Sequence, residues 1–428
     1  KKLEQGILNC EQELYAALKK DLGKSRAESY MCEVGLTLSE LRFVKKHVQK
    51  WSREKRVPTP LAQFHARSFT VQEPYGVVLV MSPWNYPVQL TLIPLIGAIA
   101  AGNCAVVKPS EYAVHSAKVL SKLLREIFDE KYVAVLLGGR AVNEAVLKER
   151  FDYIFFTGSP AVGSVVMEAA AKHLTPVTLE LGGKSPCIVD KTADIKRAAR
   201  RIVWGKFLNA GQTCVAPDYV LVQEEVKEPL LRKMKHYIRK MYRDEPLLNP
   251  EYPKIINKKH FNRLKKMLLE QDGEIITGGR MDADTLKIEP TLLAGLTGRS
   301  KVMQEEIFGP VLPVFAYSDL AEVIRILQKK EKPLALYLFT RNSRVKKTVI
   351  SKVSFGGGCI NDTIIHLSNE KLPFGGAGNS GMGAYHGKHS YETFSREKSI
   401  MEKGNWLDIP FRYPPYGKRL PLLKKLLK

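Results

Sequence analysis

The sequence predicts an α/β protein with two doubly wound domains, each built on a parallel β-sheet that helices cover on both faces. The chain has 428 residues, which is too long for one small core. From Gly76 onward, short runs of β-branched and aromatic residues alternate with segments of helical length, as in parallel sheets. The alternation begins a second time after Gly183, which indicates a second sheet.

Helices are expected before the first sheet. Four apolar residues recur on one helical face: Leu3, Ile7, Leu14 and Leu18. Gly23 then acts as a stop signal, and a second helical stretch runs through about Lys50. Residues 57–72, VPTPLAQFHARSFTVQ, are rich in proline and then become strand-like, which predicts a projecting hairpin.

The expected strands of the first sheet are GVVLVM, CAVVK, YVAVLL, YIFF and VTLEL, and those of the second include CIV, YVLV and LALYLFT. The longest apolar stretch, VQLTLIPLIGAIAA, is too short to span a bilayer and contains Pro94, so it predicts a buried helix. The final segment, YGKRLPLLKKLLK, is basic and amphipathic.

The charge of the chain is strongly positive, with 67 basic and 44 acidic residues and a formal net charge of +23. Such a field favours anionic partners. No zinc-finger, RNP or homeodomain pattern accompanies the lysines, so we expect a solvated cationic surface and no nucleic-acid partner. The six cysteines show neither metal-ligand spacing nor a disulfide framework, which predicts no metal site and a reducing cytoplasm.

Two residues are candidates for acid–base and nucleophilic chemistry. Glu180 ends the apolar strand VTLEL, where poor solvation raises a carboxyl pKa and makes it a candidate general base. The alternative is a strand-end glutamate paired with a lysine. Cys214, in NAGQTCVAP, is the candidate nucleophile. The alternative is that it is an inert thiol in a core, as most buried cysteines are. If Glu180 and Cys214 belong to different domains and face each other, the reaction takes place in the cleft between the two domains.

Asn85 stands in MSPWNYP, directly after a strand, between two prolines that stiffen the turn. An amide NH₂ held rigidly can stabilise an oxyanion with little reorganisation. The alternative is a turn asparagine that bonds its own backbone.

Two further strand ends predict a nucleotide site. VVKPSE supplies Lys108 and Glu111, and the carboxylate can take ribose hydroxyls. FFTGSPAVG ends a strand and opens a helix whose free N–H groups suit a pyrophosphate. Because GSPAVG departs from the usual G-x-G-x-x-G fingerprint, we expect an unusual binding geometry.

Seven motifs occur in the order seen in the aldehyde dehydrogenase superfamily: MSPWNYP, KPSE, FTGSPAVG, LELGGKSP, NAGQTC, EEIFGPV and LPFGGAGNSGMG. The resemblance covers essentially the whole chain. GQTCVAPDYV and RYPPY make it look like the class 3 branch, which includes fatty and aromatic aldehyde dehydrogenases.

The resemblance implies NAD(P)-dependent oxidation of an aldehyde to the carboxylic acid. It assigns Cys214 as the nucleophile that forms a thiohemiacetal and then a thioester, Glu180 as the base for the hydrolytic water, and Asn85 as the oxyanion residue. The cofactor contacts that it assigns are Lys108, Glu111, Gly158, Ser159, Gly163, Glu306 and Phe308. NAD is the first choice because Glu111 would repel the 2′-phosphate of NADP, although class 3 members commonly accept both.

The resemblance also implies an architecture. It implies an NAD(P)-binding domain at 1–56 and 73–181 and a catalytic domain at 182–385. A bridging and oligomerisation element would take 57–72 and 386–403, and a basic tail 404–428. The resemblance further implies a homodimer and an apolar aliphatic or aromatic aldehyde as substrate. We expect the tail to rest on an anionic membrane surface or to line the substrate entrance, and the alternative is a dimer-packing arm.

Two other functions are compatible with parts of the sequence. A cysteine hydrolase or esterase would need no cofactor and would activate Cys214 with one of the nine histidines, but none shares a motif with it. A non-catalytic basic scaffold would keep the fold without the chemistry.

Overall fold

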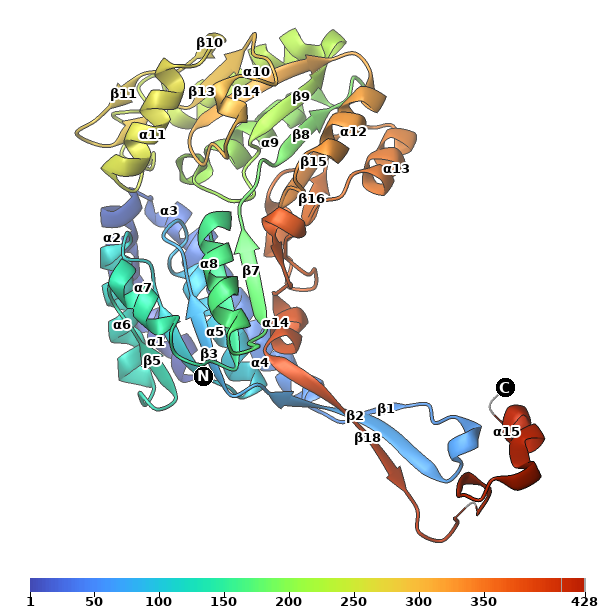
Figure 1. Ribbon diagram of the computed structural model, residues 1–428. Coiled ribbons are helices and arrows are strands. Elements are labelled where there is room, and N and C mark those ends of the chain that lie inside the picture. Colours follow the sequence, from blue (N-terminus) through green and yellow to red (C-terminus); the bar gives the residue numbers. More distant parts are fainter. Residues whose placement is uncertain (409, 427–428) are drawn as a thin grey trace.

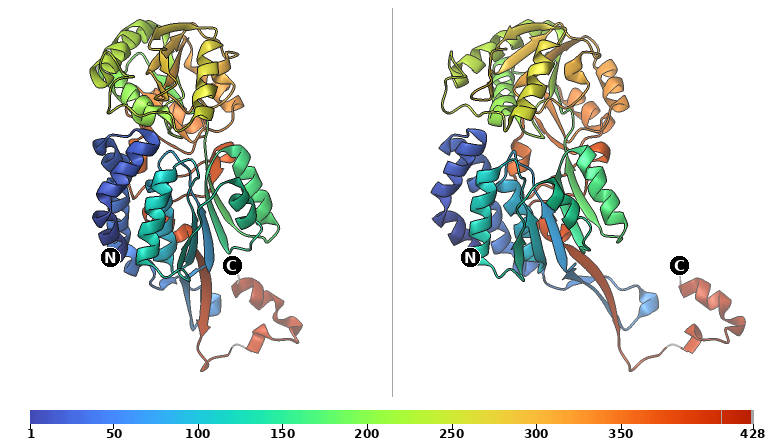
Figure 2. Two further views of the ribbon diagram at one scale, coloured as in Figure 1. Left: turned by 90° about the vertical axis from the view of Figure 1, so that its left-hand side faces the viewer. Right: turned by 60° about the vertical axis from the view of Figure 1, so that its left-hand side comes forward.

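The computed structural model describes residues 1–408 and 410–426, so Ile409, Leu427 and Lys428 of the predicted tail lie outside the described residues. Two lobes stack on each other, and a thin β-arm leaves the lower lobe (Figure 1). The C-terminal helix α15, Leu420–Leu426, lies at the far end of this arm in each of the views (Figure 2).

The lower lobe contains a six-stranded sheet in the order β17-β7-β6-β3-β4-β5. Only β17 is antiparallel to its neighbour. The strands are β3 (Val77–Met81), β4 (Cys104–Lys108), β5 (Val133–Val135), β6 (Tyr153–Gly158), β7 (Val177–Leu181) and β17 (Gly381–Met382). The five apolar runs predicted for this sheet therefore lie in β3 to β7.

Helices surround this sheet: α1 (Lys2–Asn9), α2 (Glu11–Leu22), α3 (Arg26–Ser29), a π-helical turn (Tyr30–Val34), α4 (Gly35–Trp51), α5 (Gln89–Ala101), α6 (Val114–Ile127), α7 (Arg140–Val146), α8 (Pro160–Ala171) and α14 (Gly387–Thr393). The apolar helix α5 is buried along most of its length, against β3, β4, α4 and α14. Helix α8 packs on β6 and β7, where Gly163 permits a close approach because a Cβ there would lie 2.7 Å from Leu181 Cδ2.

The upper lobe contains a seven-stranded sheet in the order β10-β13-β14-β9-β8-β15-β16. Only β10 pairs antiparallel. The strands are β8 (Pro186–Val189), β9 (Tyr219–Gln223), β10 (Glu274–Thr277), β13 (Thr291–Ala294), β14 (Val311–Tyr317), β15 (Ala335–Phe339) and β16 (Gly357–Ile360). Its helices are α9 (Ile195–Phe207), α10 (Lys227–Tyr242), α11 (Lys258–Leu269), α12 (Leu320–Lys329) and α13 (Ser343–Lys352), and a small ribbon joins β11 (Met281–Asp282) to β12 (Lys287–Ile288).

The arm is a three-stranded antiparallel sheet of β1 (Lys55–Val57), β2 (Ala66–Pro74) and β18 (Ser395–Lys403). β18 pairs with β2 over its whole length. The segment just before β18, which we assigned to the bridging element, forms α14 and packs on α4 and α5 of the lower lobe. It does so because Ser390 and Tyr391 face the core.

The chain order of the lower sheet places a crevice beside β3. From β3 the chain adds β4 and β5 on one side, then returns to add β6 and β7 on the other. This reversal between β3 and β6 is a topological switch point, and ligands of α/β sheets bind beyond the carboxyl ends of the strands there. In Figure 1 the tip of β7 points toward the upper lobe, so this crevice faces the junction of the lobes.

Candidate active site

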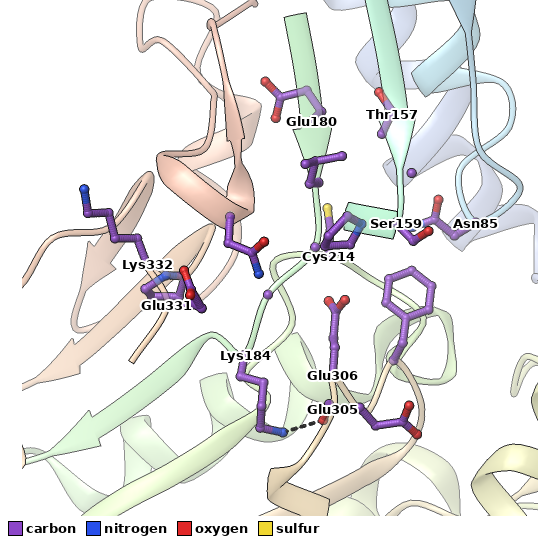
Figure 3. Close-up of a pocket in the computed structure, with 18 of the residues that line it drawn as sticks. Asn85, Thr157, Ser159, Glu180, Lys184, Cys214, Glu305, Glu306, Glu331 and Lys332 are labelled. Carbon is purple, nitrogen blue, oxygen red and sulfur yellow. Dashed lines mark hydrogen bonds between the residues drawn. The ribbon is translucent and has the colours of Figure 1, made fainter. Parts of the chain in front are cut away.

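A cavity of about 570 Å³ lies between the lobes. The sequence-predicted residues that line it are Asn85, Gly158, Ser159, Glu180, Cys214, Glu306 and Phe308. Figure 3 shows Glu180 and Thr157 projecting from the lower-lobe strands and Glu306 reaching toward Cys214 from the opposite side. The structure therefore brings residues from five distant segments of the chain to one place.

A second cavity of about 350 Å³ is lined mainly by apolar side chains. Among its lining residues are Met31, Leu36, Trp204, Ile364, Leu367 and Phe374. Glu180 and Cys214 line this cavity as well as the larger one. The thiol is thus reached from two cavities, a larger one whose lining includes several charged side chains and a smaller one lined mainly by apolar side chains.

Cys214 follows a tight turn in which Asn209, Ala210 and Gly211 all have positive φ, at 52°, 50° and 74°. A Cβ on Gly211 would lie 2.2 Å from the carbonyl oxygen of Gly309, so the turn requires glycine. Burial, with smaller contributions from the nearby Glu306 and Glu180 carboxyl groups, raises the pKa of the Cys214 thiol to about 12. The resting thiol is therefore protonated at neutral pH.

Glu180 lies at the end of β7 with its carboxyl group buried. Neither carboxyl oxygen has a hydrogen-bond partner in the described part of the chain, and burial raises its pKa well above the ordinary value. The lysine partner that we considered as the alternative is not present among these residues. In Figure 3 the carboxyl group turns sideways from the thiol. A dry, unpaired carboxyl group of this kind takes up a proton readily.

Asn85 lies in the loop after β3 and is buried. Its Nδ2 donates to the carbonyl oxygen of Gln212 at 3.1 Å, two residues before Cys214, and its Oδ1 has no partner among the described residues. The amide is therefore held against the loop that carries the thiol, and it does not bond its own turn.

The start of α8 presents N–H groups to the larger cavity. Gly158 and Ser159 line it, Pro160 occupies the first helical position, and the Ser159 side chain makes no capping bond. Unpaired N–H groups at a helix start attract anions. Gly163 lies one turn further along and contributes packing rather than cavity lining.

Lys108 and Glu111 lie at the neighbouring strand end, outside the lining of the cavity. Lys108 is buried, its Nζ donates to the carbonyl oxygen of Pro109 at 2.9 Å, and burial lowers its pKa. Glu111 is exposed, and its carboxylate lies against Gly139, where a Cβ would collide with Oε2.

The loop of Glu306 and Phe308 is held by residues that sequence reasoning missed. Arg263 donates to the carbonyl oxygens of Glu306 and Ile307 at 3.3 and 2.6 Å. Asp218 accepts from the Ile307 N–H at 2.9 Å. Arg263 lies in α11 with no strand-end position or motif to mark it, whereas Asp218 belongs to the quoted run GQTCVAPDYV.

Burial raises the pKa of Glu306 to about 8, with a contribution from Asp218. Its carboxyl group lies so close to Gly182 that a Cβ there would be 2.0 Å from Oε2. Phe308 has φ of 47° and packs edge-on against Trp84 with ring centroids 5.4 Å apart. His260, which no motif marked, lies 5.0 Å from Trp84. Among residues 1–408 and 410–426, no group of side chains is placed to hold a metal ion.

Comparisons with known proteins agree on one family. The family model described as aldehyde dehydrogenase family matches residues 1–400. A 4,4′-diaponeurosporen-aldehyde dehydrogenase from Staphylococcus aureus is 48% identical over all of this chain and 93% of its own length. Human aldehyde dehydrogenase family 3 member B1 is 47% identical over 95% of this chain and 87% of its own length. A solved structure of the substrate-bound state of Staphylococcus aureus AldH matches with a TM-score of 0.98 and 47% identity, covering 100% of this chain and 93% of that one. The chain therefore belongs to the aldehyde dehydrogenase family, in agreement with the resemblance to its class 3 branch.

Proposed function

We propose that Cys214, Glu180 and Asn85 carry out the oxidation of an aldehyde to its carboxylic acid, the reaction of this NAD(P)-dependent family, at the junction of the two cavities. One observation carries the assignment: Cys214 and Glu180 line both cavities, so a cofactor in one cavity and a substrate in the other can reach the same sulfur. Family membership disfavours the cofactor-independent hydrolase and the non-catalytic scaffold.

The residues of the larger cavity and its rim fit NAD(P). The free N–H groups at Ser159 would hold the pyrophosphate, and Lys108 and Glu111 would hold the adenosine ribose. Glu306 and Phe308 would hold the nicotinamide ribose and ring. When bound, the cofactor accepts the hydride that leaves the tetrahedral carbon. We propose NAD as the preferred form because the Glu111 carboxylate would repel a 2′-phosphate.

The chain's own groups account for the remaining chemistry. The Cys214 thiol must first release its proton to the solvent, since its pKa of about 12 leaves it neutral. The sulfur then bonds to the aldehyde carbon, and the Asn85 amide and the Cys214 N–H hold the resulting oxyanion. Loss of hydride leaves a thioester on the sulfur. Glu180 takes a proton from a water molecule, whose oxygen attacks the thioester and releases the acid.

The apolar cavity supports the proposal of an apolar substrate. Burying an alkyl chain or an aromatic ring against side chains such as Trp204, Ile364 and Phe374 is favourable by about 25 cal/mol for each Å². We propose medium-to-long-chain aliphatic and aromatic aldehydes as the substrate class. One relative is itself named for an aldehyde, 4,4′-diaponeurosporen-aldehyde.

The test measures reduced nicotinamide formed with acetaldehyde, benzaldehyde and a long-chain fatty aldehyde, with NAD and NADP in parallel. We expect turnover that increases toward the apolar aldehydes and is lost in Cys214→Ala. That variant should still bind the cofactor, and the quenching of protein fluorescence measures this binding. Turnover that survives in Cys214→Ala would contradict the proposed nucleophile, and equal rates for all aldehydes would contradict the substrate class.

We also propose a homodimer formed through the arm. β18 is the outer strand of the three-stranded sheet, so one of its edges is unpaired within the described chain. Exposed edges pair readily with a second strand. Light scattering on the purified protein should give twice the chain mass, and Lys398→Pro, in the middle of β18, should reduce it to one chain mass. A monomer without any substitution would contradict this proposal.

The far end of the arm supports a peripheral membrane contact. The segments at that end carry exposed apolar side chains, namely Leu61, Phe64, Trp406, Tyr416 and Leu420, and the sequence of the tail is rich in lysine and arginine. Such a surface suits the headgroup region of an anionic bilayer. In the described part of the chain, no helix has the length and apolarity to cross a bilayer. Flotation with anionic liposomes should carry the intact chain but not one ending at Tyr416, and equal behaviour of the two would contradict the proposal.

The six cysteines are free thiols, which supports the proposal of a reducing cytoplasmic environment.

A further inference from the structure

A buried ion pair in the N-terminal segment takes no part in the chemistry proposed above. Lys24 and Glu33 are completely buried, with Nζ 2.6 Å from Oε1. The desolvation of two charges offsets most of their attraction, so such a pair is a poor way to stabilise a fold. Glu33 belongs to a π-helical turn, a feature that often marks functional positions. The adjoining helix α3 lies where the two lobes meet (Figure 1).

The ion pair contacts the loop that carries Asn85 at two points, at Asn85 itself and at the start of α5. Lys24 Nζ donates to the Asn85 carbonyl oxygen at 2.9 Å and lies 4.0 Å from the centroid of the Tyr86 ring. Glu33 Oε2 accepts from the N–H groups of Val88 and Gln89, at 2.9 and 3.1 Å. The backbone from the carbonyl group of Asn85 to the start of α5 is therefore fixed by one pair of charges.

The same loop is bonded to the loop of the thiol. Asn209 Nδ2 donates to the carbonyl oxygens of Asn85 and Gln212, at 2.9 and 3.1 Å. The hydroxyl groups of Tyr86 and Thr213, which directly follow Asn85 and precede Cys214, are 2.5 Å apart. The carbonyl oxygen of Asn85 thus receives one bond from Lys24 and one from the thiol loop.

A third charged residue of this N-terminal segment reaches the thiol loop directly. Glu28 Oε1 accepts from the N–H of Asn209 at 2.8 Å, at the start of the positive-φ turn before Cys214. The segment therefore contacts both halves of the proposed oxyanion site, although none of these three charged side chains lines either cavity.

We propose that Lys24 and Glu33 are positioning residues, which fix the Asn85 amide relative to Cys214 so that it is already oriented when the oxyanion forms. This inference rests on the proposed function of Asn85. The physical reason is that a donor to an oxyanion is effective only when it needs no reorganisation, and a displacement of about 1 Å can lower a rate by about 10²-fold.

The experiment compares Lys24→Met, Asn85→Ala and the double variant. We expect Lys24→Met to lower kcat by about 10-fold or more while KM for the aldehyde changes less than about 2-fold, because the lost interaction belongs to the transition state. In the Asn85→Ala background the same change should alter kcat by less than about 2-fold, since the group it positions is gone. Equal losses in both backgrounds would overturn the inference.

Folding is separated from positioning by Lys24→Met/Glu33→Gln, which leaves no unpaired buried charge and keeps an acceptor for the Val88 and Gln89 N–H groups. We expect its Tm to approach that of the parent while kcat stays low, because the Asn85 carbonyl still lacks its ammonium donor. Recovery of kcat together with Tm would overturn the inference.

Lys287→Met is the matched control, because Lys287 Nζ donates to the carbonyl oxygens of Leu247 and Asn249 outside both cavities. We expect its kcat to match that of the parent, and an equal loss there would overturn the inference. If Asn85→Ala alone retains the parent kcat, the proposed function of Asn85 fails first and the inference fails with it. If Asn85→Ala lowers kcat and Lys24→Met lowers it by the same factor in both backgrounds, the inference fails but the proposed function of Asn85 stands.

Discussion

Replacing Glu180 with glutamine should separate the two halves of the reaction. Neither carboxyl oxygen is hydrogen-bonded in the described part of the chain, so the amide loses no bond and differs mainly in its inability to accept a proton. Loss of a general base lowers a rate by about 10²–10⁴-fold, or about 2.7–5.5 kcal/mol in barrier height. Because hydride loss precedes the step that needs Glu180, the thioester should accumulate in Glu180→Gln.

The assay is rapid mixing with saturating aldehyde and NAD. We expect a burst of reduced nicotinamide close to one per site, followed by a steady rate lowered by the factor above. The Glu180 pKa is raised by burial, so the steady rate of the parent should increase with pH until this group is ionised, and that increase should be missing in the variant. A variant that keeps its steady rate within about 3-fold, or shows no burst, would refute the reasoning.

The stability of the protein provides an independent check, because ionisation of Glu180 should favour catalysis but destabilise the folded state. The unfolded Glu180 ionises near 4.5, while the folded group stays protonated to a much higher pH. The parent therefore loses stability as pH rises above 4.5, and the neutral amide should not. We expect the Tm of Glu180→Gln at pH 8 to equal or exceed that of the parent. Glu289→Gln, at a buried carboxylate paired with Arg280 outside both cavities, is the control and should lower Tm but not kcat.

Three further outcomes are expected. Gly211→Ala should lower the free energy of unfolding by about 1–3 kcal/mol in a denaturant titration, because its φ of 74° and the Gly309 carbonyl leave no room for a Cβ. Leu367→Trp should fill part of the apolar cavity and lower kcat/KM for a long-chain aldehyde about 10-fold relative to acetaldehyde; an unchanged ratio would place the substrate elsewhere. Glu306→Gln should speed the alkylation of Cys214 by iodoacetamide, because that carboxyl group raises the thiol pKa, and slower alkylation would contradict this.

Strands β3 to β9 and β15 could be predicted because they read as short, continuous apolar runs. The edge strands β16 and β17 could not. β16 is the glycine-rich GGCI, and β17 is a two-residue pair inside LPFGGAGNSGMG. Main-chain hydrogen bonds to β15 and β7 hold them, and such bonds leave little trace in side-chain pattern.

The site residues that could be predicted are those that lie at or just after the end of a strand. Asn85 and Glu180 lie at the carboxyl ends of parallel strands, and the logic of α/β sheets brings such positions together. Lys24 and Glu33 gave no such signal. A lysine and a glutamate near the ends of amphipathic helices are typical of a solvated surface, and their complete burial depends on partners in a loop more than fifty residues away.

The acidic groups around the thiol also suit the direction of the proposed reaction. Cys214, Glu180 and Glu306 share one poorly solvated place, and burial raises the pKa of each. A neutral aldehyde enters this place without electrostatic cost. The carboxylic acid that forms ionises at neutral pH, and its negative charge then lies beside groups whose own ionisation is already opposed. The same low solvation that keeps the resting thiol neutral therefore favours departure of the product over its retention.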